Sequence, residues 1–239
     1  MTGTDLLLHG FAGNGASWDP VIQAAADGRW RPKAPDLPGH RGEPLAVGEG
    51  LPQLAARLAS RYGPAGTLAG YSMGGRIALQ MALDDPGCAG RLVLVSTGAG
   101  ITDPKERQAR AEADEQLAGR FAAMDRSAVA DLWLSTPLFA DDPPQAQELA
   151  LAQIEASDPA GLAGALRAFG PGGMEPLWPR LGELAIPVTI VAGERDRRYV
   201  EIGEAMAEAI PDSRLIVVPG AGHALLREAP EAVAPLVAP

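Results

Sequence analysis

One short stretch of the chain places a serine between small residues at a spacing that suits nucleophilic catalysis. Gly70-Tyr71-Ser72-Met73-Gly74 is a Gly-x-Ser-x-Gly sequence that follows an apolar run and precedes a helical pattern. A strand that passes into a helix at such a sequence turns sharply, strains the serine backbone and lifts the hydroxyl above the sheet edge. In a chain with 29 glycines the spacing alone is weak evidence. The strand before it and the helix after it predict that Ser72 is a catalytic serine.

A catalytic serine requires a base, and the base requires an acid that orients it. After this type of serine turn the acid comes next in the chain and the histidine comes last. The sequence VTIVAGERD ends an apolar run in a turn at Asp196, and VPGAGHALL places His223 in a loop before the last helical pattern. Glu194 is an alternative acid, but we favour Asp196 because it lies further into the loop. A turn or surface position is the alternative role for each of these residues.

Two backbone amides are expected to stabilise negative charge on a reacting oxygen. The amide of Met73 opens the helix after the serine, and the amide of Phe11 follows the first apolar run, LLLHGF. Both belong at the sheet edge beside Ser72. His9 and His40 lie in turns, and we expect both to stabilise loops through hydrogen bonds rather than to take part in catalysis.

Several arginines are candidates to hold an anionic substrate through charge-assisted hydrogen bonds. Arg76 lies one turn into the helix that follows the serine, and Arg107 and Arg110 lie one turn apart on a charged helical segment. Surface ion pairs with acids such as Glu106 and Glu112 are the alternative. We favour ion pairing for Arg107, whereas for Arg76 and Arg110 both roles stay open.

The elements that must position these residues form an alternating pattern of strands and helices. Six apolar runs bounded by turn residues are the expected strands, at 4–8, within 29–40, and at 67–71, 91–97, 186–193 and 213–220. Five segments with helical spacing are the expected helices, at 21–26, 51–62, 73–83, 201–210 and 230–237. Apolar runs without polar alternation are typical of a parallel sheet covered on both faces. The pattern therefore predicts a doubly wound α/β fold with a mostly parallel sheet.

The alternation stops between residues 98 and 180, where helical patterns follow one another without a convincing strand. We expect an α/β core from residues 1–97 and 181–239, with residues 98–180 inserted as a helical lid over the carboxyl ends of the strands. Ligands bind at that edge in open α/β sheets. A second structural subdomain without a gating role is the alternative. Trp133, in an apolar part of the insertion, is expected in its core or in the lining of a pocket.

Composition limits the partners of the chain. Its 239 residues carry 30 acidic and 20 basic side chains, and the formal net charge of −10 disfavours nucleic acids and anionic membranes. No run approaches the roughly 20 apolar residues of a membrane-spanning helix. Cys88 is the single cysteine and no signal-peptide pattern is present, which fits a cytoplasmic location. The three histidines have no metal-ligand spacing and no cofactor motif is visible, so we expect neither a metal nor a cofactor.

Seven motifs link the chain to a known family. LLLHGFAGNGASW, DLPGH, GYSMGGRIAL, KERQAR, STPLF, GERD and GAGH occur in this order along nearly the whole chain. Together they resemble the α/β-hydrolase superfamily and, within it, the 2-succinyl-6-hydroxy-2,4-cyclohexadiene-1-carboxylate synthases of menaquinone biosynthesis. The resemblance implies an α/β-hydrolase fold with a helical lid inserted between strands. It also implies a lyase, which eliminates pyruvate from an enolpyruvyl precursor and leaves a cyclohexadiene without forming an acyl-enzyme.

The resemblance also implies roles for individual residues. Ser72, relayed through His223 and Asp196, removes a proton next to a carbonyl, and the two amides stabilise the charge that develops. The implied partner is a small substrate that carries carboxylates. The positions that match substrate-binding residues of the family are Tyr71, Arg76, Arg110 and Trp133.

One carboxylate-binding arginine of the family has no counterpart in the second half of the insertion. Gln153 or Ile154 stands near its place, and Arg167 is a candidate substitute from another direction. Leu134 stands where an aromatic neighbour of Trp133 is expected. Two other functions stay open: an esterase or C–C bond hydrolase that uses the same three residues, and a small-molecule binder without catalysis.

Overall fold

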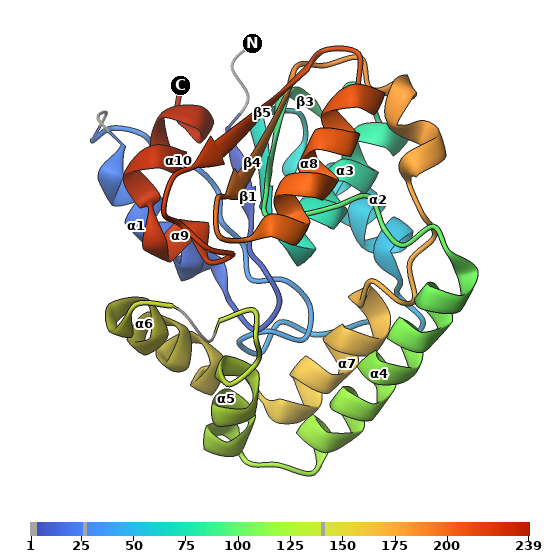
Figure 1. The fold of residues 1–239 in the computed structure, drawn as a ribbon, viewed down its shortest axis with the longest axis vertical. Coiled ribbons are helices and arrows are strands. Elements are labelled where there is room, and N and C mark those ends of the chain that lie inside the picture. Colours follow the sequence, from blue (N-terminus) through green and yellow to red (C-terminus); the bar gives the residue numbers. More distant parts are fainter. Residues whose placement is uncertain (1–3, 26–27, 140–141) are drawn as a thin grey trace.

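The computed structural model describes residues 4–25, 28–139 and 142–239 of the chain. Five strands of the described chain form one sheet in the spatial order β1-β2-β3-β4-β5, and neighbouring strands are parallel (Figure 1). The strands are β1 Leu6–Leu8, β2 Ala65–Tyr71, β3 Ala89–Val95, β4 Val188–Gly193 and β5 Ser213–Val218. The helices are α1 Asp19–Ala24, α2 Leu51–Tyr62, α3 Met73–Asp84, α4 Pro104–Ala122, α5 Arg126–Leu134, α6 Pro144–Glu155, α7 Pro159–Phe169, α8 Arg197–Ala209, α9 Leu225–Glu228 and α10 Pro230–Val237, with 3₁₀ turns η1 Gly15–Trp18 and η2 Trp178–Glu183.

Helices cover both faces of the sheet, so β1–β4 are largely buried on both sides, whereas the edge strand β5 stays mostly half-buried or exposed. In β3, Leu92 and Leu94 join a core that includes residues of α2, α3 and α8, whereas Val93 and Val95 join a second core with α1, α9 and α10. Figure 1 shows these two helix layers on either side of the sheet. Because successive side chains of the inner strands point to opposite faces that are both buried, these strands read as continuous apolar runs.

The strand predicted within residues 29–40 is wrong. Only Lys33 of this segment pairs with the sheet, in an isolated parallel bridge to Leu6 of β1. Pro32 and Pro35 flank this residue closely and have no N–H group to donate, so the pairing cannot extend into a ladder. The other predicted strands and helices are confirmed with ends shifted by a few residues, and residue 26, the predicted end of the first helix, lies outside the described residues.

Four helices, α4–α7, lie between β3 and β4 in the chain and form a separate layer. α4 packs against α7 and α5 against α6, and Figure 1 shows the four grouped away from the helices that cover the sheet. Their shared core consists of Ala12, Ala118, Phe121, Val129, Ala130, Ile154, Leu162, Ala163 and Leu166. None of the helices in the described parts of the chain is long and apolar enough to cross a bilayer. We call α4–α7 the inserted helices below, and their gating role stays a prediction.

Candidate active site

Ser72 occupies the sharp turn between β2 and α3. Its backbone φ angle is 51° with ψ at −109°, a left-handed conformation that few non-glycine residues adopt. The glycines beside it are required by close packing, because a Cβ on Gly70 would lie 2.2 Å from the carbonyl oxygen of Gly74. A Cβ on Gly74 would lie 2.3 Å from that of Leu8. The turn therefore has the geometry that the Gly-x-Ser-x-Gly spacing predicts, with the serine hydroxyl at the carboxyl end of the sheet.

Three predicted side chains form a chain of hydrogen bonds. His223 Nε2 lies 3.2 Å from Ser72 Oγ, and His223 Nδ1 lies 2.6 Å from Asp196 Oδ2. The carboxylate favours the tautomer with hydrogen on Nδ1, which leaves the Nε2 lone pair free to accept the serine proton. The alternative acid, Glu194, is exposed and accepts a hydrogen bond from the amide of Gly220 instead. The geometry can thus support general-base chemistry at Ser72 through Asp196 rather than Glu194.

A buried acid that sequence reasoning missed holds the loop around His223. Glu228, at the end of α9, accepts hydrogen bonds from the amides of Gly222 (2.9 Å) and Ala224 (3.0 Å), on either side of the histidine. It also pairs with Arg195, which precedes the acid of the hydrogen-bond chain. The sequence gives little signal for this role, since Glu228 reads as an ordinary charge at a helix end. The Arg195–Glu228 pair joins the two loops that carry the acid and the base.

The two predicted amides lie where negative charge could develop beside the serine. Met73 is the first residue of α3, so its N–H points out of the helix N-terminus, and Phe11 sits in the turn after β1. Neither amide donates a hydrogen bond to another group of the described chain. Both residues line the same cavity as Ser72. The arrangement can serve as an oxyanion hole.

The turn that carries the amide of Phe11 is fixed by two buried histidines. His9 Nδ1 lies 2.7 Å from the carbonyl oxygen of Gly10, and its Nε2 accepts the amide of Leu37 at 2.9 Å. His40 Nε2 accepts the amide of Ala12 at 3.1 Å. Burial lowers the pKa of His9 well below its usual value and lowers the pKa of His40 to about 4. Both are therefore neutral at pH 7 and engaged with the backbone, as expected of loop-stabilising residues.

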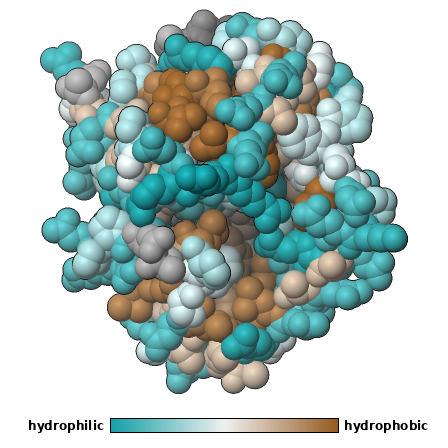
Figure 2. Space-filling view, viewed as in Figure 1, coloured by the Kyte–Doolittle hydropathy of each residue, from teal (hydrophilic) through white to brown (hydrophobic). Residues whose placement is uncertain are grey.

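A cavity of about 380 Å³ opens above Ser72, between the sheet edge and the inserted helices. Figure 2 shows a hollow at this level, with apolar residues inside it and polar residues around its mouth. One side of the cavity is aromatic. Phe11 lies edge-on to Trp133 with ring centroids 5.0 Å apart, and Tyr71 and Tyr199 contact the imidazole of the base. Tyr71 and Trp133 thus line the cavity, as the resemblance implies.

The opposite side of the cavity is cationic, and its most buried member is Arg76. This side chain is only 8% exposed, and its guanidinium donates to the carbonyl oxygen of Phe169 at 2.9 Å. Its Nε has no partner, and no carboxylate of the described chain lies within ion-pair distance. Burial lowers the pKa of Arg76, and the nearby charge of Arg110 lowers it further. A buried guanidinium with no counter-ion is the arrangement expected where a ligand supplies the negative charge.

Two further arginines line the cavity near its mouth. Arg110, on α4, forms an ion pair with Asp114 at 2.7 Å and also lines the cavity, so the ion pair is present and the substrate-binding role stays a prediction. Arg107 pairs with Glu175 at 3.7 Å and does not line the cavity, in agreement with the ion-pair interpretation. Arg198, on α8, lines the cavity but was not predicted. Its signal was its place two residues after the acid in the motif GERDRR.

The place of the family's missing arginine is occupied by neutral groups. The side-chain oxygen of Gln153 accepts a hydrogen bond from Ser17 at 2.8 Å, and Ile154 is buried in the core of the inserted helices. The prediction that Arg167 substitutes for this arginine is wrong. Arg167 forms a bidentate pair with Glu115 at 2.8 Å on the surface and does not line the cavity, because its position on α7 faces α4.

Comparison with known proteins shows the family to which the chain belongs. The sequence model of the Alpha/beta hydrolase family matches residues 6–236. Since this span covers nearly the whole described chain, the chain belongs to the Alpha/beta hydrolase family. The parallel sheet with flanking helices is the fold of that family, so the predicted fold class is confirmed.

Individual relatives narrow the class. A Yersinia pestis (strain Pestoides F) protein named 2-succinyl-6-hydroxy-2,4-cyclohexadiene-1-carboxylate synthase is 33% identical over 208 residues, which cover 82% of this chain and 74% of the relative. The solved structure of MenH from S. aureus aligns with a TM-score of 0.89 at 30% identity, over 99% of this chain and 92% of that one. An esterase from Thermogutta terrifontis with malate bound aligns with a TM-score of 0.82 at 27% identity, over 99% and 89% of the two chains. The resemblance read from the motifs is confirmed, and the chain is an enzyme of this fold.

Proposed function

We propose that this enzyme is a lyase that eliminates pyruvate from an enolpyruvyl cyclohexene carboxylate in menaquinone biosynthesis. The names of its relatives support this reaction. The observation that carries the proposal is Arg76, a buried guanidinium without a carboxylate partner in the same cavity as Ser72. A substrate with several carboxylates supplies the missing negative charge. The single, buried Cys88 is compatible with the cytoplasmic location that we infer for such an enzyme.

The proposed reaction needs a base and a site for developing negative charge. His223 Nε2 takes the hydroxyl proton of Ser72 while the serine oxygen removes a proton from the ring carbon next to a carbonyl. The electron pair of that C–H bond enters the new diene as the C–O bond to the enolpyruvyl group breaks. The departing enolpyruvate takes up the proton held by the enzyme and becomes pyruvate. No bond forms between the substrate and the serine.

The surrounding groups divide the remaining work. The amides of Phe11 and Met73 stabilise the enolate-like oxygen, and Asp196 stabilises the imidazolium of His223. Arg76 and Arg110 hold carboxylates, while the aromatic side of the cavity contacts the ring. The inserted helices act as a lid, since they supply one wall of the cavity and exclude water from the reacting atoms.

An esterase or C–C bond hydrolase is the second candidate function. The hydrogen-bond chain of Ser72, His223 and Asp196 suits an acyl-enzyme as well as proton removal. The Thermogutta terrifontis esterase has the same fold, and its structure contains malate, a dicarboxylate. A hydrolase of neutral esters, however, has no use for an unpaired buried arginine.

The test measures pyruvate release from the enolpyruvyl menaquinone precursor by the purified enzyme, with a p-nitrophenyl ester in parallel. We expect rapid pyruvate release that falls by at least about 10⁴-fold in Ser72→Ala, the loss typical when one member of such a catalytic unit is removed. Serine-dependent ester cleavage without pyruvate release establishes the hydrolase instead. Full activity of Ser72→Ala in both assays contradicts the mechanism.

A further inference from the structure

A small recess opens beside the main cavity, between α3, α4 and α8. Its volume is about 70 Å³, roughly one fifth of the 380 Å³ of the main cavity. The recess is lined by Arg76, Gly98, Gly100, Ile101, Arg110, Pro171, Arg198, Tyr199 and Ile202. All three arginines of the main cavity therefore also line the recess, and no acidic residue of the described chain is among the lining groups.

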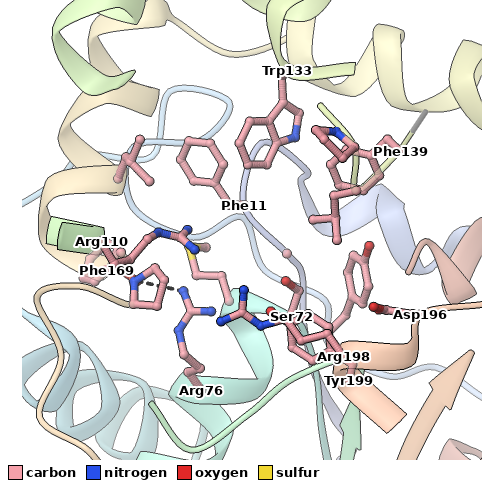
Figure 3. A pocket seen from close by; sticks show the side chains of 18 residues that line it. Phe11, Ser72, Arg76, Arg110, Trp133, Phe139, Phe169, Asp196, Arg198 and Tyr199 are labelled. Atoms are coloured by element: carbon pink, nitrogen blue, oxygen red, sulfur yellow. Dashed lines mark hydrogen bonds between the residues drawn. The ribbon is translucent and has the colours of Figure 1, made fainter. Parts of the chain in front are cut away.

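Figure 3 shows the guanidinium groups of Arg76, Arg110 and Arg198 directed toward one another from three different elements. Like charges brought together in a partly buried space repel one another, so the arrangement favours an anion between them. Arg76 contributes a buried Nε that has no partner. The described contacts of Arg110 use only its Nε, toward Asp114, which leaves its terminal nitrogens for a ligand. The recess is thus built to receive negative charge.

Arg198 is the most exposed member of this group. Its terminal nitrogen lies 3.6 Å from Glu106 on α4, and both side chains are more than 60% exposed. An ion pair of this length and exposure adds little to stability, because water screens both charges. A substrate carboxylate in the recess, held in part by the buried Arg76, competes well for Arg198 against a solvated glutamate.

We propose that the recess is a carboxylate subsite and that Arg198 is a third substrate-binding arginine, released from Glu106 when the substrate enters. The inference rests on the proposed function, because it assigns one carboxylate of that substrate to the recess. The small volume suits a carboxylate and excludes the ring, which stays in the main cavity above Ser72. Arg198 reaches the substrate from α8 and so supplies the third positive charge that the inserted helices lack at Gln153.

The experiment compares Arg198→Ala with Arg197→Ala, which removes the same charge from an exposed neighbour that lines neither cavity. We expect the KM for pyruvate release to rise about five- to tenfold in Arg198→Ala, as for loss of one charge-assisted bond at a cavity mouth, with kcat within about twofold. Arg197→Ala is expected to keep the KM of the unchanged enzyme. Glu106→Gln, which removes the competing carboxylate, is expected to lower KM by about twofold.

The outcomes separate this inference from the proposed function. Pyruvate release with the same KM in Arg198→Ala and in the unchanged enzyme overturns the subsite and leaves the lyase intact. An equal rise of KM in Arg197→Ala and Arg198→Ala also overturns it, because the effect is then one of net charge. Absence of pyruvate release from the unchanged enzyme overturns the lyase and the subsite together.

Discussion

The two sides of the cavity differ in whether the protein itself satisfies their polar groups. On the side of the base, His223 has Asp196 on one ring nitrogen and Ser72 on the other, at 2.6 and 3.2 Å. On the cationic side, Arg76 is equally buried but has one carbonyl oxygen as its partner and an Nε with none. The polar groups of the first side are paired within the protein, whereas those of the second leave a buried donor without a partner.

This difference suggests that one side of the cavity serves the chemical step and the other the choice of substrate. We expect the fully paired Ser–His–Asp chain to act on any suitable carbon or carbonyl that reaches it. A buried charge without a counter-ion destabilises the folded state, since its lost hydration is not replaced. A ligand of opposite charge restores the balance, so we expect the arginine side to determine which substrates are accepted. Variants on the side of the base are therefore expected to fail with charged and neutral substrates alike, and variants on the cationic side with the charged substrate alone.

The largest effect is expected on the paired side. Asp196→Asn keeps the shape of the side chain but favours the wrong tautomer of His223, so Nε2 no longer accepts the proton of Ser72. We expect pyruvate release and ester cleavage both to fall by about 10⁴-fold, the loss typical for this acid. Steady-state kinetics at pH 7 with both substrates measures the effect.

Glu194→Gln is the matched control for this variant. It makes the same chemical change two residues away, on an exposed side chain that accepts a hydrogen bond from the amide of Gly220. We expect its activity within about twofold of the unchanged enzyme. If Glu194→Gln were the inactive variant and Asp196→Asn the active one, the acid would be wrongly assigned.

A smaller and more selective effect is expected on the cationic side. Arg76→Met removes the buried guanidinium and keeps an apolar side chain of similar length. Pyruvate release is expected to fall about 100-fold through the lost charge-assisted bonds, while cleavage of a neutral p-nitrophenyl ester stays within a few-fold. Because the unpaired charge is costly in the free enzyme, the same change is expected to raise the free energy of unfolding by about 1 kcal/mol or more.

Kinetics with the two substrates and urea denaturation test both halves of this prediction. Arg107→Met is the matched control, since Arg107 pairs with Glu175 outside the cavity. Equal losses with the charged and neutral substrates after Arg76→Met would show that this residue supports the serine turn rather than substrate selection. A lower stability would show that its charge is satisfied in the free enzyme.

The sequence predicted the paired side better than the cationic side, for a physical reason. Ser72 lies in a local turn whose glycines are required by contacts with Gly74 and Leu8, and such local chemistry is visible in the sequence. Which arginines meet depends instead on how α3, α4 and α8 pack together. Periodicity gives the face of one helix but not its neighbour, so Arg198 was missed, and Arg167 was named as a candidate substitute although it lies on the surface.

The sequence also failed to predict the role of Glu228 and wrongly predicted a strand within residues 29–40. Glu228 was missed because the sequence does not show that the amides of Gly222 and Ala224 turn toward the end of α9, although both lie within six residues of it. The apolar content of residues 29–40 suggested a strand, yet the prolines around Lys33 limit it to a single bridge. The other apolar runs were identified correctly because a sheet covered on both faces favours them, and their prolines, Pro187 and Pro219, lie outside the strands.

The smallest effect on activity at pH 7 is expected for a change at His40, which together with His9 holds the turn of Phe11. His40 is neutral in the folded enzyme because burial lowers its pKa from 6.5 to about 4, and burial lowers the pKa of His9 in the same direction. The unfolded chain therefore binds protons between these pH values while the folded enzyme does not. It follows that stability is present above pH 6.5 and is lost as the pH falls, by about 2 kcal/mol for His40 between pH 6.5 and 5.

Urea denaturation at pH 7, 6 and 5 measures this loss, and His40→Gln separates the two histidines. Glutamine retains an acceptor for the amide of Ala12 but does not titrate, so the variant is expected to show a shallower dependence of unfolding free energy on pH, with activity at pH 7 nearly unchanged. An unaltered slope would mean that His40 does not gain a proton on unfolding. A large loss of activity at pH 7 would show that His40 takes part in the reaction itself rather than only supporting the turn of Phe11.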